Sequence, residues 1–227
     1  MGIEFHHVVK RFENGSVALS DVSMTIPEGS LTFLTGHSGA GKTTFLNLLL
    51  RLEKPTGGRI LVNGVDIATL RRRHLPAYRR YLGMVFQDGQ LLEERTVFGN
   101  VAVPLHVVGM TARDAGRRVR AALESVGLLP KAALLPAQLS AGERQRLVIA
   151  RAVVNRPKIL LADEPTGNLD PTLSKAVMGL FHRFRGVGVT VIVASHDMAL
   201  VGTMGSRVVE LEHGRVVGDT ERGMAGG

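Results

Sequence analysis

The chain has 227 residues, of which 44% are hydrophobic, and it carries 28 Lys and Arg against 20 Asp and Glu. This length suits one compact α/β domain with an inserted lobe, and it is short for two full domains. The chain has no cysteine, which excludes disulfides and thiolate metal sites. Because no apolar run is long enough for a membrane span and the N-terminus lacks signal-peptide features, we expect a cytosolic location.

The net charge of +8 favours anionic partners, such as nucleic acid or the inner surface of a membrane. The basic residues are scattered apart from one cluster at 71–73 and 79–80. We interpret this cluster as a solvated helix face rather than a binding patch. With two Tyr and no Trp, the chain has few rings for base stacking, so no nucleic-acid partner is expected.

The first part of the chain predicts strands joined by turns. Residues 3–9 alternate, residues 17–26 continue as a second antiparallel strand, and Asn63-Gly64 centres a hairpin over residues 59–67. Buried strands are predicted at 31–35 and 82–86, with a helix over 44–50.

The second part predicts helices and buried parallel strands. A helical region follows Gln87 and contains a helix over 111–126, and Ser140 with Glu143 forms a capping box for a helix that ends near Asn155. Apolar strands at 158–162 and 189–194 flank a helix over 171–184, as in a parallel sheet that is buried on both faces. A short hairpin over 208–217 and a flexible tail from 218 follow.

A phosphate-binding loop lies between the strand at 31–35 and the helix that follows. The segment fits G-x-x-x-x-G-K-[ST], in which glycines let backbone N–H groups face phosphate oxygens at a helix N-terminus. Lys42 would reach the β- and γ-phosphates, and Thr43 would offer its hydroxyl to Mg²⁺. The predicted nucleotide-binding residues here are Gly36, His37, Ser38, Gly39, Ala40, Gly41, Lys42, Thr43 and Thr44.

Two adjacent carboxylates, Asp163 and Glu164, end the apolar strand at 158–162. The carboxyl end of a parallel strand faces the ligand crevice, so Asp163 can hold Mg²⁺ through water and Glu164 can polarise an attacking water. The alternative is a helix N-cap, because Pro165 follows the pair.

A second potential anion site lies at the start of the capped helix. Its residues are Ser140, Ala141, Gly142 and Glu143. One ATP does not need two helix N-termini, so two copies of the chain, facing head to tail, would each lend this site to the γ-phosphate of the other.

In their order and spacing, these motifs resemble those of ABC transporter ATP-binding subunits over nearly the whole chain. The resemblance implies Walker A at 36–43, Walker B at 159–163 and a signature motif at 139–143. It implies catalytic roles for Glu164, for the Q-loop Gln87, for Asp170 of the D-loop and for the switch His196. It also implies ATP and Mg²⁺ as cofactors, with Thr43, Gln87 and Asp163 at the metal.

Phe12 lies where the family places an aromatic ring against adenine, although a ring packed into the core is the alternative. Two positions depart from the signature of the family. Ala141 replaces a glycine but keeps its backbone N–H, and Glu143 replaces glutamine.

The resemblance also implies the fold and its division. We expect an α/β fold with a RecA-like P-loop core, a mostly parallel sheet, an N-terminal antiparallel β subdomain and an inserted α-helical subdomain. Within one domain over 1–227, residues 1–88 and 156–217 form the nucleotide-binding core, residues 89–155 form the helical subdomain, and residues 218–227 form a flexible tail.

Residues 163–170 are similar to the branch of the family that serves lipoprotein release, macrolide efflux and cell division. Four further stretches, 36–43, 83–88, 95–104 and 188–197, are similar to those of the cell-division ATP-binding proteins. This implies an ATP-dependent homodimer bound to an FtsX-like permease on the cytoplasmic face of the inner membrane at the septum, with cytosolic division proteins as further partners. Lipoprotein-release and macrolide-export ATPases are the alternative.

The apolar stretch that follows Gln87 is interrupted by polar residues and is too broken to span a bilayer. We expect residues 91–110 to form the groove for the membrane partner, with Val101 and Leu105 in contact with it. The core of the helical lobe is the alternative.

Overall fold

The computed structural model describes residues 2–221. It confirms the antiparallel N-terminal region, in which a four-stranded sheet has the order β2-β1-β4-β5. Asn63 and Gly64 both have positive φ, 50° and 79°, as a tight hairpin between β4 and β5 requires. The strands of this sheet are β1 (Gly2–Arg11), β2 (Val17–Pro27), β4 (Gly57–Val62) and β5 (Val65–Asp66).

The second sheet has six strands in the order β10-β9-β3-β8-β7-β6, and all of its pairs are parallel except β10 with β9. Every residue of β3, β7 and β8 is buried, as the apolar runs predicted for strands covered on both faces. The strands are β3 (Leu31–Thr35), β6 (Leu82–Val85), β7 (Ile159–Asp163), β8 (Thr190–Ala194), β9 (Arg207–Glu212) and β10 (Arg215–Asp219).

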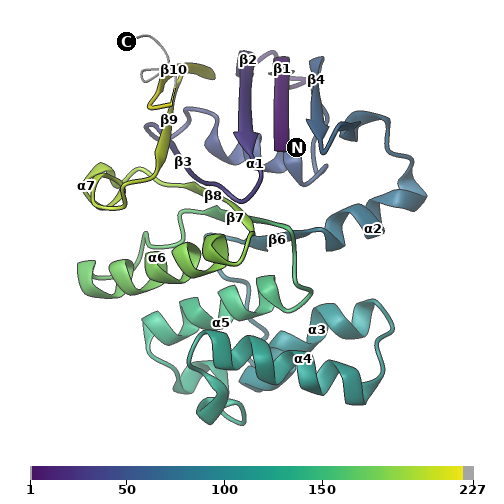
Figure 1. Ribbon diagram of the computed structural model, residues 1–227, viewed down its shortest axis with the longest axis vertical. Coiled ribbons are helices and arrows are strands. Elements are labelled where there is room, and N and C mark those ends of the chain that lie inside the picture. Colours follow the sequence, from purple (N-terminus) through teal and green to yellow (C-terminus); the bar gives the residue numbers. More distant parts are fainter. Residues whose placement is uncertain (1, 222–227) are drawn as a thin grey trace.

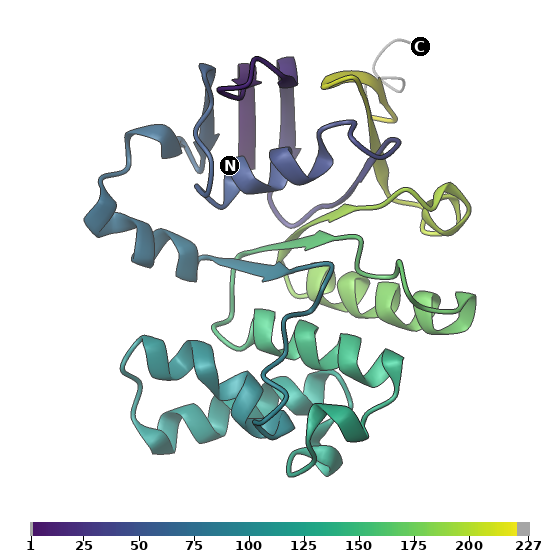
Figure 2. The ribbon, with the colours of Figure 1, turned by 180° about the vertical axis from the view of Figure 1, so that it is seen from behind.

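Helices lie between the two sheets and over the far face of the parallel sheet (Figures 1 and 2). The α-helices are α1 (Lys42–Leu49), α2 (Leu75–Arg80), α3 (Val97–Val107), α4 (Ala112–Ser125), α5 (Ala141–Val153), α6 (Pro171–Gly186) and α7 (Met198–Gly202). Short 3₁₀ turns occupy Ile67–Thr69, Arg72–His74, Leu129–Lys131 and Pro136–Gln138.

Two of these helices, α2 and α7, have no counterpart among the predicted elements. Helix α2 carries part of the basic cluster and buries none of its residues, which agrees with a solvated helix face. Arg79 has a further role, because its guanidinium donates to the carbonyl oxygens of Leu50 and Arg51 at 3.2 and 3.0 Å, just past the end of α1.

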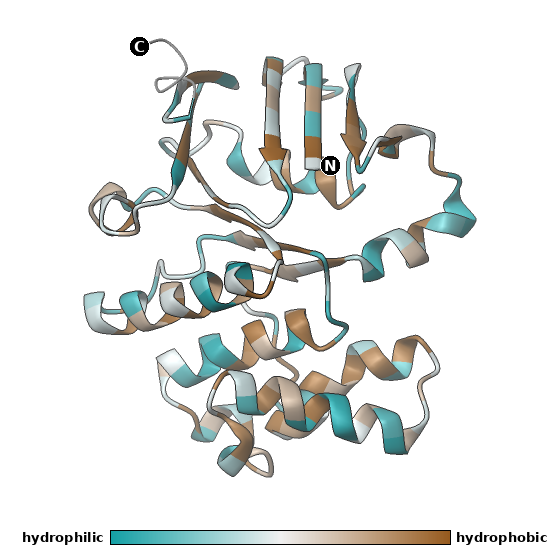
Figure 3. Cartoon of the chain, in the orientation of Figure 1, coloured by the Kyte–Doolittle hydropathy of each residue, from teal (hydrophilic) through white to brown (hydrophobic). Residues whose placement is uncertain are grey.

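The parallel sheet separates two hydrophobic cores. Leu34 and Ile192 point toward α1 and the antiparallel sheet, where Phe45 of α1 stacks on Phe5 with a centroid distance of 4.2 Å. Phe33 and Val193, their neighbours along the strands, point the other way toward α6 and the helical lobe. The fold class is confirmed as α/β, and Figure 3 shows hydrophobic residues along the central strands.

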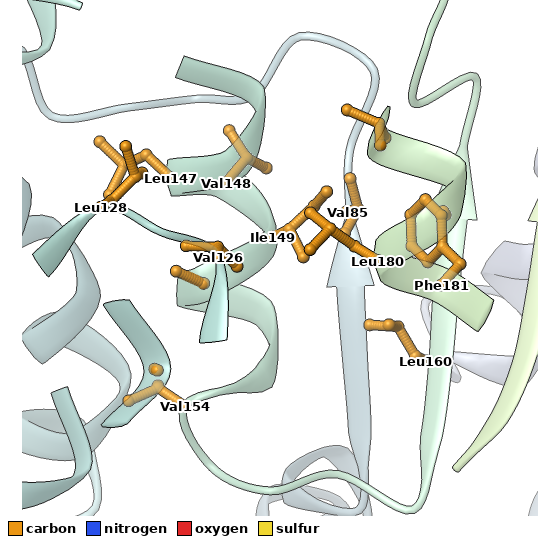
Figure 4. Packing of buried hydrophobic residues seen from close by; sticks show 14 of the residues in the cluster. Val85, Val126, Leu128, Leu147, Val148, Ile149, Val154, Leu160, Leu180 and Phe181 are labelled. Carbon is orange, nitrogen blue, oxygen red and sulfur yellow. The ribbon is translucent and has the colours of Figure 1, made fainter. Parts of the chain in front are cut away.

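Helices α3, α4 and α5 pack together and form the inserted lobe below the parallel sheet (Figure 1). Helix α5 connects this lobe to the sheet, because Ile149 packs among Val85, Leu160, Leu180 and Phe181 (Figure 4). The interface is therefore a continuous apolar core.

Two expectations for the segments around the lobe and the C-terminus need correction. Val101 and Leu105 are fully buried in the core of the lobe, so they cannot line a groove for a partner. Strand β10 runs to Asp219, two residues into the expected tail, and Arg207 forms an ion pair with Asp219 at 2.7 Å. Residues 222–227 lie outside the described part of the chain.

Within residues 2–221, no helix combines the length and apolar character needed to cross a membrane.

Candidate active site

The phosphate-binding loop forms one wall of a cavity of about 460 Å³ at the carboxyl ends of the parallel strands. Two glycines are required by close backbone contacts. A Cβ on Gly36 would lie 2.2 Å from the carbonyl oxygen of Leu211, and one on Gly41 would lie 2.6 Å from that of Ala18. Both also have positive φ. The cavity is lined by Ala18, His37, Ser38, Gly39, Gly41, Lys42, Thr43, Thr44, Gln87, Asp163, Glu164 and His196.

Seven of the nine residues predicted to bind nucleotide in this loop therefore reach the cavity wall. The other two, Gly36 and Ala40, do not line the cavity and contact the backbone of the β9–β10 region instead. Gly36 lies against Leu211, and the buried Ala40 accepts a hydrogen bond from the backbone N–H of Gly214 at 3.1 Å.

Lys42 is buried and folds back over the loop. Its ammonium donates to the carbonyl oxygens of Gly36 and His37 at 2.6 and 3.1 Å. The same nitrogen lies 3.7 Å from a carboxylate oxygen of Glu164. The positive charge is thus held at the cavity wall, between the loop carbonyls and the Glu164 carboxylate.

Thr43 and Asp163 form the oxygen-rich part of the cavity. The Thr43 hydroxyl donates to Asp163 Oδ2 at 2.8 Å, which joins the start of α1 to the end of β7. Burial raises the pKa of Asp163, and the Thr43 hydrogen bond partly counteracts this shift. A hydroxyl beside a carboxylate is a suitable ligand pair for Mg²⁺, which prefers oxygen.

Glu164 and His196 form a second pair in the lining of the same cavity. His196 Nδ1 is 2.9 Å from Glu164 Oε2, and the Glu164 side chain is only 13% exposed. Glu164 has a φ of 47°, an unusual conformation for a residue with a Cβ, and its N–H donates to the carbonyl oxygen of Ala194 on β8. Its carboxylate therefore faces the cavity from a strained and firmly held backbone.

Gln87 reaches the same cavity from the end of β6. The residues after it are bound to the helical lobe, because Arg151 of α5 donates to the carbonyl oxygens of Gly89 and Gln90. A displacement of Gln87 would therefore be transmitted to α5.

The signature residues form a separate cluster, and none of them lines the phosphate-binding cavity. Ser140 and Ala141 are exposed, and Ser140 caps α5 together with Glu143. Lys131 compensates the Glu143 charge at 2.6 Å. Gly142 packs against α6, since a Cβ there would lie 2.9 Å from a methyl carbon of Leu173 and would displace that side chain.

Two further predicted site residues also lie away from the cavity lining. Asp170 is the N-cap of α6, where its carboxylate accepts from the N–H groups of Thr172 and Leu173. Phe12 lies at the turn between β1 and β2, partly buried, with the Lys10 ammonium 4.9 Å from its ring centroid. Ala18 lines the cavity and was not predicted, because it carries no chemical signature and only the path of β2 places it there.

Comparison with known proteins places this geometry in a family. The family described as ABC transporter matches residues 19–167. The cell division ATP-binding protein FtsE of Escherichia coli K12 is 50% identical over 95% of this chain and 97% of its own length. FtsE of Mycobacterium tuberculosis is 48% identical over 100% and 99%, and FtsE of Bacillus subtilis is 46% identical over 99% and 98%.

Solved structures agree with these sequence relatives. A bacterial ABC transporter cassette in its dimeric form has a TM-score of 0.85 and 34% identity, and the match covers 96% of this chain and 97% of the cassette. A dimer of the same cassette in a post-hydrolysis state, bound to ADP and Pi, matches equally well at 0.85 and 33%. The chain belongs to the ABC ATPase family and is an FtsE-like member of it.

Proposed function

We propose that this chain binds ATP and Mg²⁺ in the cavity under the phosphate-binding loop and hydrolyses ATP there, as one subunit of a membrane complex. One observation carries this proposal. Thr43 and Asp163 are joined at 2.8 Å, next to Glu164 and His196 at 2.9 Å, under a loop in which Gly36 and Gly41 have no space for a side chain.

The residues of the cavity fit the two proposed cofactors. Backbone N–H groups of the loop and the Lys42 ammonium supply positive charge for phosphate oxygens, while Thr43 and Asp163 supply oxygen ligands for the cation. Gln87 reaches the same space and completes the proposed set. When bound, Mg²⁺ neutralises charge that develops between the β- and γ-phosphates.

Glu164 is the proposed general base. Its carboxylate accepts a proton from a water molecule as the water oxygen bonds to the γ-phosphorus, and the bond to the bridging oxygen of the β-phosphate breaks. His196 contacts the same carboxylate at 2.9 Å and orients it. The burial of Glu164 limits competition from bulk water for this carboxylate.

The signature residues act in a dimer in this proposal. Because Ser140, Ala141, Gly142 and Glu143 do not reach the cavity of their own chain, they would contact the γ-phosphate held by a second copy. The dimeric cassette that resembles this chain supports such an arrangement. Asp170 would contribute at the dimer interface, and Phe12 would pack against adenine.

Coupling to a membrane partner is the second part of the proposal. The relatives are described as cell division ATP-binding proteins, which supports a role in division. In this proposal the chain lies at the cytoplasmic face of the inner membrane at the septum. It binds an FtsX-like permease there and activates peptidoglycan hydrolysis, with cytosolic division proteins as further partners. The bonds of Arg151 to the segment after Gln87 supply a route from the cavity to the helical lobe.

A surface contact for this partner must use exposed residues of the lobe. Val107 at the end of α3 is 81% exposed, in contrast to the buried Val101 and Leu105. We therefore move the proposed contact from the interior of residues 91–110 to the end of α3.

Co-purification from solubilised membranes, with the partner identified by mass spectrometry, tests this part. Val107→Glu should reduce recovery of the permease, whereas Val187→Glu, at a valine that is 78% exposed beyond α6, should not. Both variants should keep their affinity for ATP. Equal recovery with both variants would exclude the end of α3, and recovery of a lipoprotein-release or macrolide-export permease would favour that alternative function.

A further inference from the structure

We propose that His37, Glu212 and His213 form a binding site for a divalent transition-metal ion, of which Zn²⁺ is the representative. One potential ligand atom from each residue lies within 4.8 Å of the other two. His37 comes from the phosphate-binding loop, and the other two come from the end of β9 and the turn toward β10. The site is separate from the Mg²⁺ ligands of the proposed ATPase function and goes beyond that function.

The donor set selects the kind of metal. Two imidazoles and one carboxylate are a ligand combination that suits Zn²⁺, whereas Mg²⁺ prefers oxygen alone. Within residues 2–221, no other group of three or more His, Asp or Glu side chains approaches this closely. The three side chains are exposed, so an ion can enter directly from solvent.

His37 is already oriented as a metal ligand. Its Nδ1 lies 2.7 Å from the carbonyl oxygen of Ser38, and a carbonyl can only accept. Nδ1 therefore carries the hydrogen and Nε2 carries the free lone pair. Metal-bound histidines in proteins are typically fixed by this type of hydrogen bond to a backbone carbonyl.

The second histidine is held close to the first by the backbone. The rings of His37 and His213 are 5.4 Å apart at an angle of 63°. The adjacent Gly214 donates its N–H to Ala40 in the loop at 3.1 Å and accepts from the N–H of Ser20 at 2.8 Å. These bonds fix the turn against the loop, so metal binding requires only rotation of exposed side chains.

The three ligand atoms, which lie within 4.8 Å of one another, must move closer together to bind one ion. Tetrahedral Zn²⁺ with bonds of about 2.0–2.1 Å places its ligand atoms about 3.3 Å apart, with water in the fourth position. His213 and Glu212 have room to move by this amount because both are exposed. The site is therefore suited to exchangeable binding rather than to a permanent structural ion.

A metal here would connect the phosphate-binding loop to the β9–β10 turn. The carbonyl oxygen of His37 accepts from the Lys42 ammonium at 3.1 Å and from the backbone N–H of Ala40 at 3.1 Å. Fixing the His37 side chain would therefore restrain the segment that positions Lys42. This places a metal-responsive element directly beside the nucleotide cavity.

Calorimetric titration of Zn²⁺ into nucleotide-free protein without a histidine tag tests the site. Excess Mg²⁺ is present throughout, so that oxygen-only sites are occupied. We expect one Zn²⁺ per chain, with affinity reduced at least about tenfold in His37→Ala and in His213→Ala, and less in Glu212→Gln. His106→Ala, at an exposed histidine on α3, is the matched control and should bind as the wild type does.

A second measurement separates loss of a ligand from loss of the fold. Zn²⁺ should raise the melting temperature of the wild type and of His106→Ala but not that of His213→Ala, while all three melt alike without the metal. Wild-type protein that binds no Zn²⁺, or binding that His213→Ala leaves intact, would overturn the proposal.

Binding that disappears in His196→Ala instead would assign the ion to the Glu164–His196 pair and would also overturn the proposal. Because the titration contains no nucleotide, its outcome does not depend on whether the chain hydrolyses ATP.

Discussion

Helices α1 and α5 both begin at sites assigned to phosphate, but their first turns are built in opposite ways. Helix α1 has Gly41 as its N-cap, with no side-chain cap and no acidic residue in the first turn. Helix α5 has a complete capping box, in which Ser140 accepts from the N–H of Glu143 and Glu143 accepts from the N–H of Ser140. The first turn of a helix leaves N–H groups without partners in the helix. In α1 no side chain caps the N–H groups of the first turn, so they can bind a ligand. In α5 the Ser140 side chain already accepts from one of these N–H groups.

This difference indicates that the two helix termini contribute unequally to nucleotide binding. The cavity at α1 has a lysine, two glycines that lie against neighbouring backbone, and Thr43 and Asp163 as oxygen ligands for a cation. At the terminus of α5 the Glu143 carboxylate accepts from the N–H of Ser140 and pairs with Lys131 at 2.6 Å, so the capping side chains leave fewer donors for an anion. Tight binding of nucleotide should therefore depend on the α1 site, and the α5 site should contribute only when a second chain delivers a phosphate to it.

Lys42→Ala should have the largest effect, because Lys42 is the only Lys or Arg among the described residues that line the cavity. One charge-assisted contact is worth roughly 10- to 100-fold in affinity, and hydrolysis should fall below detection. Binding of a fluorescent ATP analogue and phosphate release measure the two effects. Lys175→Ala, at an exposed lysine on α6, is the control and should behave as the wild type. Unchanged turnover in Lys42→Ala would contradict the assignment of the loop.

Glu164→Gln should slow hydrolysis by about 10²–10⁴-fold and keep ATP affinity, because the amide retains the shape but cannot take up the proton of water. The variant should then accumulate as a dimer with two nucleotides, which light scattering with ATP and Mg²⁺ can detect. Ser140→Arg in the same background blocks the α5 site and should prevent dimerisation. Equal dimerisation with and without Ser140→Arg would exclude the head-to-tail arrangement. The same measurement on the complex with the proposed permease tests whether closure requires the membrane partner.

Ser140→Ala separates the capping role of this serine from its role in the dimer. Loss of the cap should lower the free energy of unfolding by about 1 kcal/mol. Thr111→Ala is a matched control, because Thr111 caps α4 in the same lobe by accepting from the N–H of Asp114. Both variants should lose similar stability in chemical denaturation, but only Ser140→Ala should weaken ATP-driven dimerisation. If Thr111→Ala weakens it equally, the effect comes from the stability of the lobe.

The sequence predicted those parts of the molecule in which neighbouring residues determine the structure. The strand, loop and helix around Lys42 and the capping box at Ser140 are local, and the structure has both as predicted. The carboxyl ends of parallel strands also meet as expected, which brings Asp163 close to Thr43. These features follow from backbone geometry and hydrogen bonding over a few residues.

The sequence could not predict features that depend on which distant surface a residue meets. The apolar character of Val101 and Leu105 indicates burial, but it does not distinguish the core of the lobe from a groove for a partner. Ala18 reaches the cavity through the path of β2 alone, and His213 approaches His37 through a turn 176 residues away in the sequence. Neither contact leaves a pattern in the surrounding residues.

Asp163→Asn should have the smallest effect on the fold. It should raise the stability of the nucleotide-free protein but remove Mg²⁺-dependent hydrolysis. Burial raises the pKa of Asp163, so the folded state disfavours its charged form. Its contribution to the free energy of unfolding is therefore highest below the ordinary carboxyl pKa of 3.8 and falls as pH rises through the raised pKa. The neutral amide removes this penalty and can still accept from the Thr43 hydroxyl. In nucleotide-free protein at neutral pH, the melting temperature should rise, by about 2–4 °C for each kcal/mol gained in a domain of this size.

The same substitution removes a charged ligand from the proposed Mg²⁺ site, so it should abolish Mg²⁺-dependent hydrolysis and the stabilisation that ATP with Mg²⁺ confers. Melting curves of wild type and Asp163→Asn between pH 4 and pH 8, with and without ATP and Mg²⁺, test both effects. The difference in melting temperature without ligand should be largest at neutral pH and should disappear near pH 4, while the sign should reverse when ATP and Mg²⁺ are present. A variant that is less stable than the wild type at neutral pH without ligand would show that Asp163 stabilises the fold. The carboxylate pair would then be structural, and the cavity at α1 would not be built around a cation.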